Sequence, residues 1–98
     1  MKIPEEFSLL NRSFSVAWMD EDTHLIAQAK GAASLEQGRV LLYPSEHRED
    51  LEHTFLHELI HMVFESSGYP ELSKNEEFVD LISGMLHQYM RTKKGELE

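Results

Sequence analysis

The chain has 98 residues, no cysteine, and 18 acidic against 9 basic residues, which gives a formal net charge of −9. This length allows one domain, residues 1–98, and the composition excludes disulfides and thiolate metal ligands. The acidic balance disfavours binding to nucleic acid or to anionic membranes. The N-terminus is not signal-like and no apolar run reaches the ~20 residues of a membrane span, so we expect a cytoplasmic protein.

Three strands are predicted in the first half of the chain. Residues 13–19 alternate apolar and polar side chains, as a strand with one buried face does. A second strand is expected within residues 25–35. The sequence Glu36-Gln37-Gly38 then indicates a hairpin turn into a third strand at residues 39–43.

The order of these strands follows from their apolar patterns. The strand at 39–43 carries apolar side chains on both faces, which is typical of a central strand. We therefore expect it between the other two, with the strand that contains Gly31 at an edge. A meander with the 25–35 strand in the centre is the alternative. The predicted fold class is α+β, a three-stranded mixed or antiparallel sheet packed on two helices.

Two helices are predicted after the sheet. Pro44 ends the third strand, and Ser45 is a candidate cap for a helix that runs to about Ser66. The sequence Ser73-Lys74-Asn75-Glu76 has the S-x-x-E form of a capping box and opens a last helix. The apolar residues of this last helix recur at helical spacing, so we expect them to face the core: Phe78, Ile82, Met85 and Tyr89.

The first of these helices contains an H-E-x-x-H sequence, His57-Glu58-Leu59-Ile60-His61. Residues four apart lie about one turn apart on the same helix face, so both imidazoles can reach one metal ion. Between residues 54 and 64 the polar side chains are Thr54, His57, Glu58 and His61, and they fall within an arc of roughly 100°. A mostly buried helix with this single polar stripe predicts a metal site in preference to hydrogen-bonded core histidines.

Catalytic zinc keeps three protein ligands and leaves one position for water, so the two histidines need a third partner. The last helix offers Glu76, Glu77 and Asp80. Glu76 is also the reciprocal partner in the proposed capping box, and Glu77 becomes the candidate ligand if the cap holds Glu76. A different interpretation is that these acidic residues only suit the positive end of the helix dipole.

The H-E-x-x-H motif together with Asn75-Glu76-Glu77-Phe78-Val79-Asp80, of the form N-E-x-x-x-D, resembles the gluzincin metallopeptidases, the thermolysin-like branch of the H-E-x-x-H enzymes. Residues 13–90 are similar in size and element order to the single-domain minigluzincins. The resemblance implies a zincin core that holds one Zn²⁺ through His57, His61 and Glu76. It also implies that Asp80 orients His57, as an oxygen usually does for the other N–H of a ligating imidazole.

The predicted function is therefore zinc-dependent hydrolysis of peptide bonds. Glu58, beside the metal without binding it, accepts the proton of the attacking water and returns it to the leaving nitrogen. The substrate, a peptide or protein, is expected to pair with the edge strand near Gly31. The alternative function is a non-catalytic zinc-binding domain that recruits a partner through the same edge strand.

Two-domain gluzincins also stabilise the transition state from a second lobe, which 98 residues do not provide. Tyr69 and His87 are the only nearby substitutes, although we expect Tyr69 to pack between the helices and His87 to be solvated. His53 is expected at the surface. The resemblance thus predicts activity that is weak or latent.

Overall fold

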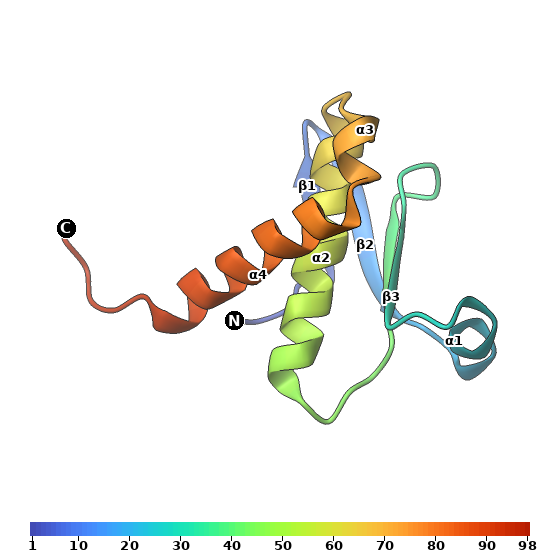
Figure 1. Cartoon of the computed structure of the whole chain (residues 1–98), viewed down its shortest axis with the longest axis horizontal. Helices are drawn as coiled ribbons and strands as arrows, with labels where there is room; N and C mark the ends of the chain where they lie inside the picture. Colours follow the sequence, from blue (N-terminus) through green and yellow to red (C-terminus); the bar gives the residue numbers. More distant parts are fainter.

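Four segments of the chain pair into one mixed sheet, one long helix packs on this sheet, and a second long helix packs on the first (Figure 1). The computed structural model describes residues 1–98. In chain order the elements are β1 (Glu6–Leu9), β2 (Arg12–Trp18), α1 (Glu21–Ala27), β3 (Gly31–Ser34), β4 (Arg39–Leu42), α2 (Arg48–Ser66), α3 (Pro70–Ser73) and α4 (Glu76–Thr92).

The strand order is β1-β2-β4-β3, with β2 and β4 parallel and the other two pairs antiparallel. The α+β class is confirmed, and so is the prediction that the strand after the hairpin turn lies between the other two. Gly31 begins β3, which is an edge strand as expected. The prediction of three strands is wrong, because the sheet has four.

The additional strand, β1, pairs with β2 through a two-residue turn. Leu10 and Asn11 form this turn with positive φ angles of 48° and 64°. Two-residue hairpin turns usually carry glycine or asparagine at such positions. Leucine is unusual there, so the sequence around Leu10 does not indicate a turn. The hairpin matters for packing because Phe7 of β1 stacks on Phe14 of β2, with 5.3 Å between the ring centroids.

Part of the region expected to contain the second strand forms the short helix α1. The side chain of Asp20 accepts a hydrogen bond from the backbone N–H of Thr23 and caps this helix. Gln28, with φ 52° and ψ 40°, ends the helix in the left-handed region. The strand itself is therefore restricted to β3, four residues long.

Helix α2 lies across the sheet and supplies much of the core. Its start differs from the prediction: His47 is the N-cap, and the Ser45 hydroxyl accepts a hydrogen bond from the N–H of His47 instead of capping the helix. No helix of this fold combines the length and the apolar character that crossing a membrane requires. The buried core consists of Phe14, Val40, Leu42, Leu51, Phe55, Leu56 and Met62.

Helix α4 crosses α2 on the side away from the sheet (Figure 1). The predicted core face of this helix is wrong except at Ile82, which is half-buried, since the buried residues are Val79, Ser83 and His87. Met85 and Tyr89 are instead 63% and 62% exposed. The reason is the position of α4: it meets α2 along the polar stripe of that helix, so the polar side of α4 turns inward.

Candidate metal centre

Two histidines on α2 face the beginning of α4. His57 and His61 lie one turn apart, and their side chains are 21% and 14% exposed. The residues that precede them in sequence, Leu56 and Ile60, are buried. This burial fixes the rotation of α2 about its axis, so the H-E-x-x-H stripe emerges from the core toward α4.

The beginning of α4 is capped differently from the prediction. Asn75 is the N-cap, and its side chain accepts a hydrogen bond from the N–H of Phe78. Ser73 belongs to α3, so the S-x-x-E capping box does not form. The Glu76 side chain is therefore not bound in a capping box, and it extends toward α2.

Glu76 completes a cluster with the two histidines. Its Oε2 lies 3.0 Å from Nε2 of His57, and its Oε1 lies 3.1 Å from Nε2 of His61. The ligand atoms of these three residues lie within 4.8 Å of one another, and Glu77 does not belong to the group. Of the two glutamates considered from the sequence, only Glu76 is placed to share a metal ion with both histidines.

The spacing of these three groups fits a small tetrahedral ion. The two Nε2 atoms are 3.3 Å apart, and each is about as far from a Glu76 oxygen. Zinc with bonds of ~2.0–2.1 Å to nitrogen and oxygen sets its ligand atoms roughly 3.3 Å apart. The same distances also suit hydrogen bonds between Glu76 and a protonated histidine, so an ion pair is the alternative arrangement.

The other ring nitrogen of each histidine has its own partner. Nδ1 of His57 lies 3.4 Å from Oδ1 of Asp80, and Nδ1 of His61 lies 2.8 Å from Oγ of Ser73. The Ser73 hydroxyl donates to Oε2 of Glu65 at 2.8 Å. A hydrogen on each Nδ1 leaves a lone pair on each Nε2, which is the tautomer that metal binding requires.

Glu58 lies beside the cluster and is not one of its possible ligands. The residue is only 9% exposed. Burial raises the pKa of its carboxyl to about 7; nearby His57 opposes the rise, whereas Glu76 and Glu65 add to it. A carboxyl with this pKa takes up and releases a proton near neutral pH, as a general base must.

Gly31 of the edge strand lies against this carboxyl. A Cβ atom at Gly31 would be 2.7 Å from Cγ2 of Thr54 and 3.1 Å from Cγ of Glu58. The missing side chain thus lets β3 approach α2 closely, which gives the glycine a role in packing. Its predicted role in substrate binding stays a prediction.

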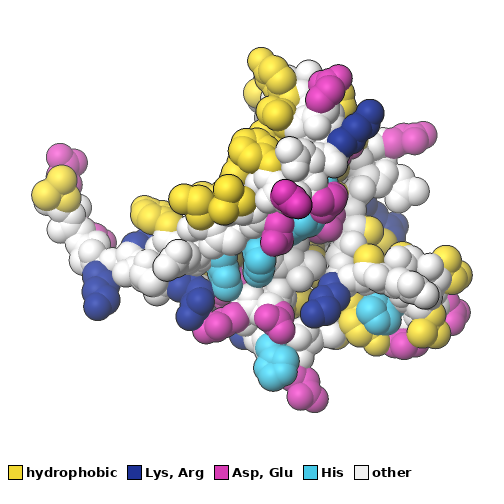
Figure 2. Space-filling view, viewed as in Figure 1, with side chains coloured by type: hydrophobic (Ala, Val, Ile, Leu, Met, Phe, Trp, Pro, Cys, Tyr) yellow, Lys and Arg dark blue, Asp and Glu magenta, His cyan; other side chains and the backbone are white.

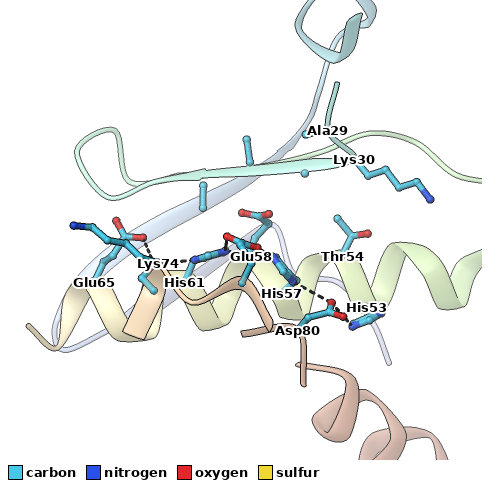
Figure 3. Close-up of a pocket in the computed structure, with 15 residues that line it drawn as sticks. Ala29, Lys30, His53, Thr54, His57, Glu58, His61, Glu65, Lys74 and Asp80 are labelled. Carbon is cyan, nitrogen blue, oxygen red and sulfur yellow. Dashed lines mark hydrogen bonds and ion pairs between the residues drawn. The ribbon is translucent and has the colours of Figure 1, made fainter. Parts of the chain in front are cut away.

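A cleft of about 710 Å³ lies between the edge strand and the polar stripe of α2 (Figure 3). One wall is the segment 29–33, and the other is formed by α2 together with the α3–α4 junction. Figure 3 shows the strand running alongside the stripe, with Glu58 directed toward it. Since β3 pairs only with β4, the backbone groups on its other side are not used by the sheet.

Several residues that line the cleft were not predicted as part of the site, among them His53, Glu65 and Ser73. His53, expected at the surface, has its Nε2 3.5 Å from Oδ1 of Asp80. Glu65 lies one turn after His61 and extends the polar stripe, so helical spacing alone could have found it. Ser73 gave no such signal, because its sequence context indicated a helix cap.

The two residues considered as transition-state stabilisers do not line the cleft. Tyr69 is 58% exposed, so it is not packed between the helices as expected. His87 is not solvated as expected: it is 7% exposed, and its Nε2 lies 3.0 Å from Oε1 of Glu52.

The chain matches no family model, no curated protein and no solved structure. The cleft itself provides three side chains that can share a metal ion, a buried carboxyl with a pKa near neutrality and a free strand edge.

Proposed function

We propose that this chain is a zinc metallopeptidase with a zincin core of the gluzincin type. His57, His61 and Glu76 are the ligands of one Zn²⁺ per chain, and Glu58 is the general base. The observation that carries the proposal is the convergence of the two Nε2 atoms and the Glu76 carboxylate at separations of 3.0 to 3.3 Å, with a non-ligating carboxyl beside them.

The donor set supports zinc as the cofactor. Two imidazoles and one carboxylate are the ligands of many catalytic zinc sites, which keep a further position open. Glu76 is 67% exposed, so the cluster is accessible from solvent. When bound, zinc would lower the pKa of a coordinated water toward ~7 and polarise the substrate carbonyl.

The chain's own residues supply the proton transfers and the orientation of the ligands. Glu58 takes the proton from the attacking water and delivers it to the leaving nitrogen. Asp80 and Ser73 hold the two imidazoles through their Nδ1 atoms. They are positioning residues in this proposal.

A peptide or protein is the substrate class that the cleft suits. Its wall is an edge strand whose free backbone groups can pair with an extended peptide. A peptide added along β3 near Gly31 would lie next to Glu58. We also propose a cytoplasmic location and no binding to nucleic acid or membranes, as the sequence predicts.

The second candidate function is a non-catalytic zinc domain. It is favoured by the cluster's position between two helices, because a metal bound there would join α4 to the part of the fold that contains the core. It is also favoured by the absence of Tyr69 and His87 from the cleft. In this case the edge strand would recruit a partner protein.

Metal content and hydrolysis separate these candidates. We expect about one zinc per chain in the native protein, by mass spectrometry of purified samples, and its loss in His61→Ala and Glu76→Gln. Glu77→Gln is the matched control, one residue away and outside the cluster, and should keep its zinc.

Glu58→Gln should keep its zinc while losing hydrolysis of an unfolded protein substrate. Zinc bound without any hydrolysis in the native protein would favour the non-catalytic domain. No metal in any sample after zinc is added back would refute both candidates.

A further inference from the structure

The apolar face of α4 is only partly covered by the rest of the fold. Phe78, at its beginning, is 37% exposed and stacks on Phe64 of α2, with 5.9 Å between the ring centroids. Further along the helix, Leu81 is 59% exposed, Met85 63% and Tyr89 62%. Figure 2 shows a continuous ridge of hydrophobic side chains along this helix. Extended apolar patches of this kind are unusual on a monomeric domain and mark a contact surface.

This face lies on the opposite side of α4 from the metal cluster. At about 100° per residue, Met85 and Tyr89 point roughly 140–180° away from Glu76 and Asp80. Glu76 and Asp80 contact His57 of α2. A partner that covers the apolar face therefore leaves the cleft open.

We propose that two copies of this chain pair through α4 in an antiparallel arrangement. Four residues follow the alternating four- and three-residue steps of a two-helix seam: Phe78, half-buried Ile82, Met85 and Tyr89. These positions are symmetric about the midpoint of the seam. A two-fold axis there sets Phe78 opposite Tyr89 of the second copy and Ile82 opposite Met85 of the second copy. Such self-complementarity is what a two-fold symmetric dimer requires.

The charges at the two ends of α4 favour the antiparallel direction. The first turn is acidic, with Glu76 and Glu77, and the last turn carries Arg91, which pairs with Glu49 of α2 at 3.1 Å. Lys93 and Lys94 follow directly. Antiparallel pairing brings Glu77 of one copy beside the basic end of the other, whereas parallel pairing would bring like charges together.

The size of the seam predicts a reversible dimer. The helix has 17 residues, which corresponds to a length of about 25 Å. A seam of this length buries less than the ~800 Å² per partner of a standard protein interface. We therefore expect the chain to form dimers at micromolar concentrations and to be monomeric at lower concentrations.

Analytical ultracentrifugation of the 98-residue chain from about 1 μM to about 1 mM tests the proposal. We expect a shift from monomer to dimer with concentration, and Met85→Glu should stay monomeric with unchanged circular dichroism and metal content. Ile26→Glu on α1, at a residue 85% exposed, is the control and should dimerise normally. A native chain that stays monomeric throughout would overturn the proposal and leave the face to a different protein.

Cysteine cross-linking tests the direction of pairing, and the chain has no cysteine of its own to interfere. Ile82→Cys and Met85→Cys proteins are mixed and oxidised. Antiparallel pairing predicts cross-links mainly between the two different variants. Cross-links mainly between like variants would contradict the antiparallel arrangement.

Discussion

Asp80 of α4 holds His57 of α2 by the ring nitrogen that faces away from the metal cluster, with 3.4 Å between Oδ1 and Nδ1. Two sets of contacts thus connect the helices: Glu76 with the Nε2 atoms of His57 and His61, and Asp80 with Nδ1 of His57. The Asp80 side chain is 64% exposed, so it contributes little to the core, and its contact with His57 can be tested without disturbing the fold.

We expect Asp80→Ala to weaken zinc binding by about 10- to 100-fold, because the His57 ring loses the group that sets its orientation and tautomer. Asp80→Asn keeps an oxygen acceptor and should cost less. Zinc affinity can be measured by competition with a chelator, with Glu77→Ala as the control. Equal affinity in Asp80→Ala and the native protein would remove the positioning role.

Ser73→Ala should weaken zinc binding by about tenfold, because Nδ1 of His61 loses its 2.8 Å partner. Glu65→Gln acts through the Ser73 hydroxyl, so its effect should be smaller and should not add fully to that of Ser73→Ala. Ser66→Ala is the matched control. Its hydroxyl is buried without a hydrogen-bond partner, so its removal should leave zinc affinity unchanged. Additive effects of Ser73→Ala and Glu65→Gln would contradict the chain of hydrogen bonds.

Gly31→Ala should destabilise the protein by about 1–3 kcal/mol, because the new Cβ would overlap Cγ2 of Thr54 at 2.7 Å. Thr54→Ser removes that methyl group and should recover part of the loss in the double variant. Urea denaturation of the single and double variants measures the coupling. At Gly84 the nearest atom to a new Cβ is 3.7 Å away, so Gly84→Ala should be tolerated. No coupling between Gly31→Ala and Thr54→Ser would show that β3 does not lie this close to α2.

The raised pKa of Glu58 predicts how the stability of the metal-free protein depends on pH. The folded carboxyl has a pKa of about 7 against an ordinary value of 4.5. Between these values the folded state binds more protons at Glu58 than the unfolded state does. The contribution of Glu58 to stability is therefore fully present below about pH 4.5 and is lost as the pH rises through 7. The loss attributable to Glu58 is roughly 3 kcal/mol.

Glu58→Gln cannot ionise and should lack this part of the pH dependence. Denaturant unfolding with a chelator present, compared between the two proteins from about pH 4.5 to pH 8, measures the difference. Glu52 contributes in the opposite direction: burial alone would raise its pKa, but hydrogen bonds from His87 and the N-terminal ammonium lower it overall. That contribution is common to both proteins and cancels. Parallel stability curves would contradict the raised pKa of Glu58.

Helical spacing and apolar pattern predicted much of the cluster and the sheet. Residues four apart on one helix must share a face, so the approach of His57 to His61 follows from their spacing. The central position of β4 followed from apolar side chains on both of its faces. The likeness to N-E-x-x-x-D placed Glu76 with the two histidines, and Glu76 is the glutamate found within the cluster.

The orientation and capping of α4 could not be predicted in the same way. An apolar stripe shows which side chains share a face, but it does not show whether that face turns inward. On α4 the polar side turns inward because α2 presents polar groups there. Capping was misassigned because Ser73 and Asn75 are both suitable caps, and only the tertiary fold engages Ser73 with His61 and Glu65.

The three possible ligands are divided between two helices. His57 and His61 belong to α2, which packs on the sheet, and Glu76 belongs to α4, which packs on the outside of α2, so a metal ion bound by all three would connect α4 to the rest of the fold. Release of α4 would separate Glu76 from His57 and His61 while the sheet stays folded. In the proposed function zinc would bind only the form in which α4 is docked on α2, so the zinc concentration would set how often α4 is released. When zinc is present, the amide hydrogens of α4 would then exchange more slowly with solvent, and those of β4 would exchange at an unchanged rate. Metal supply would in this way determine the lifetime of the helix that carries the exposed apolar face.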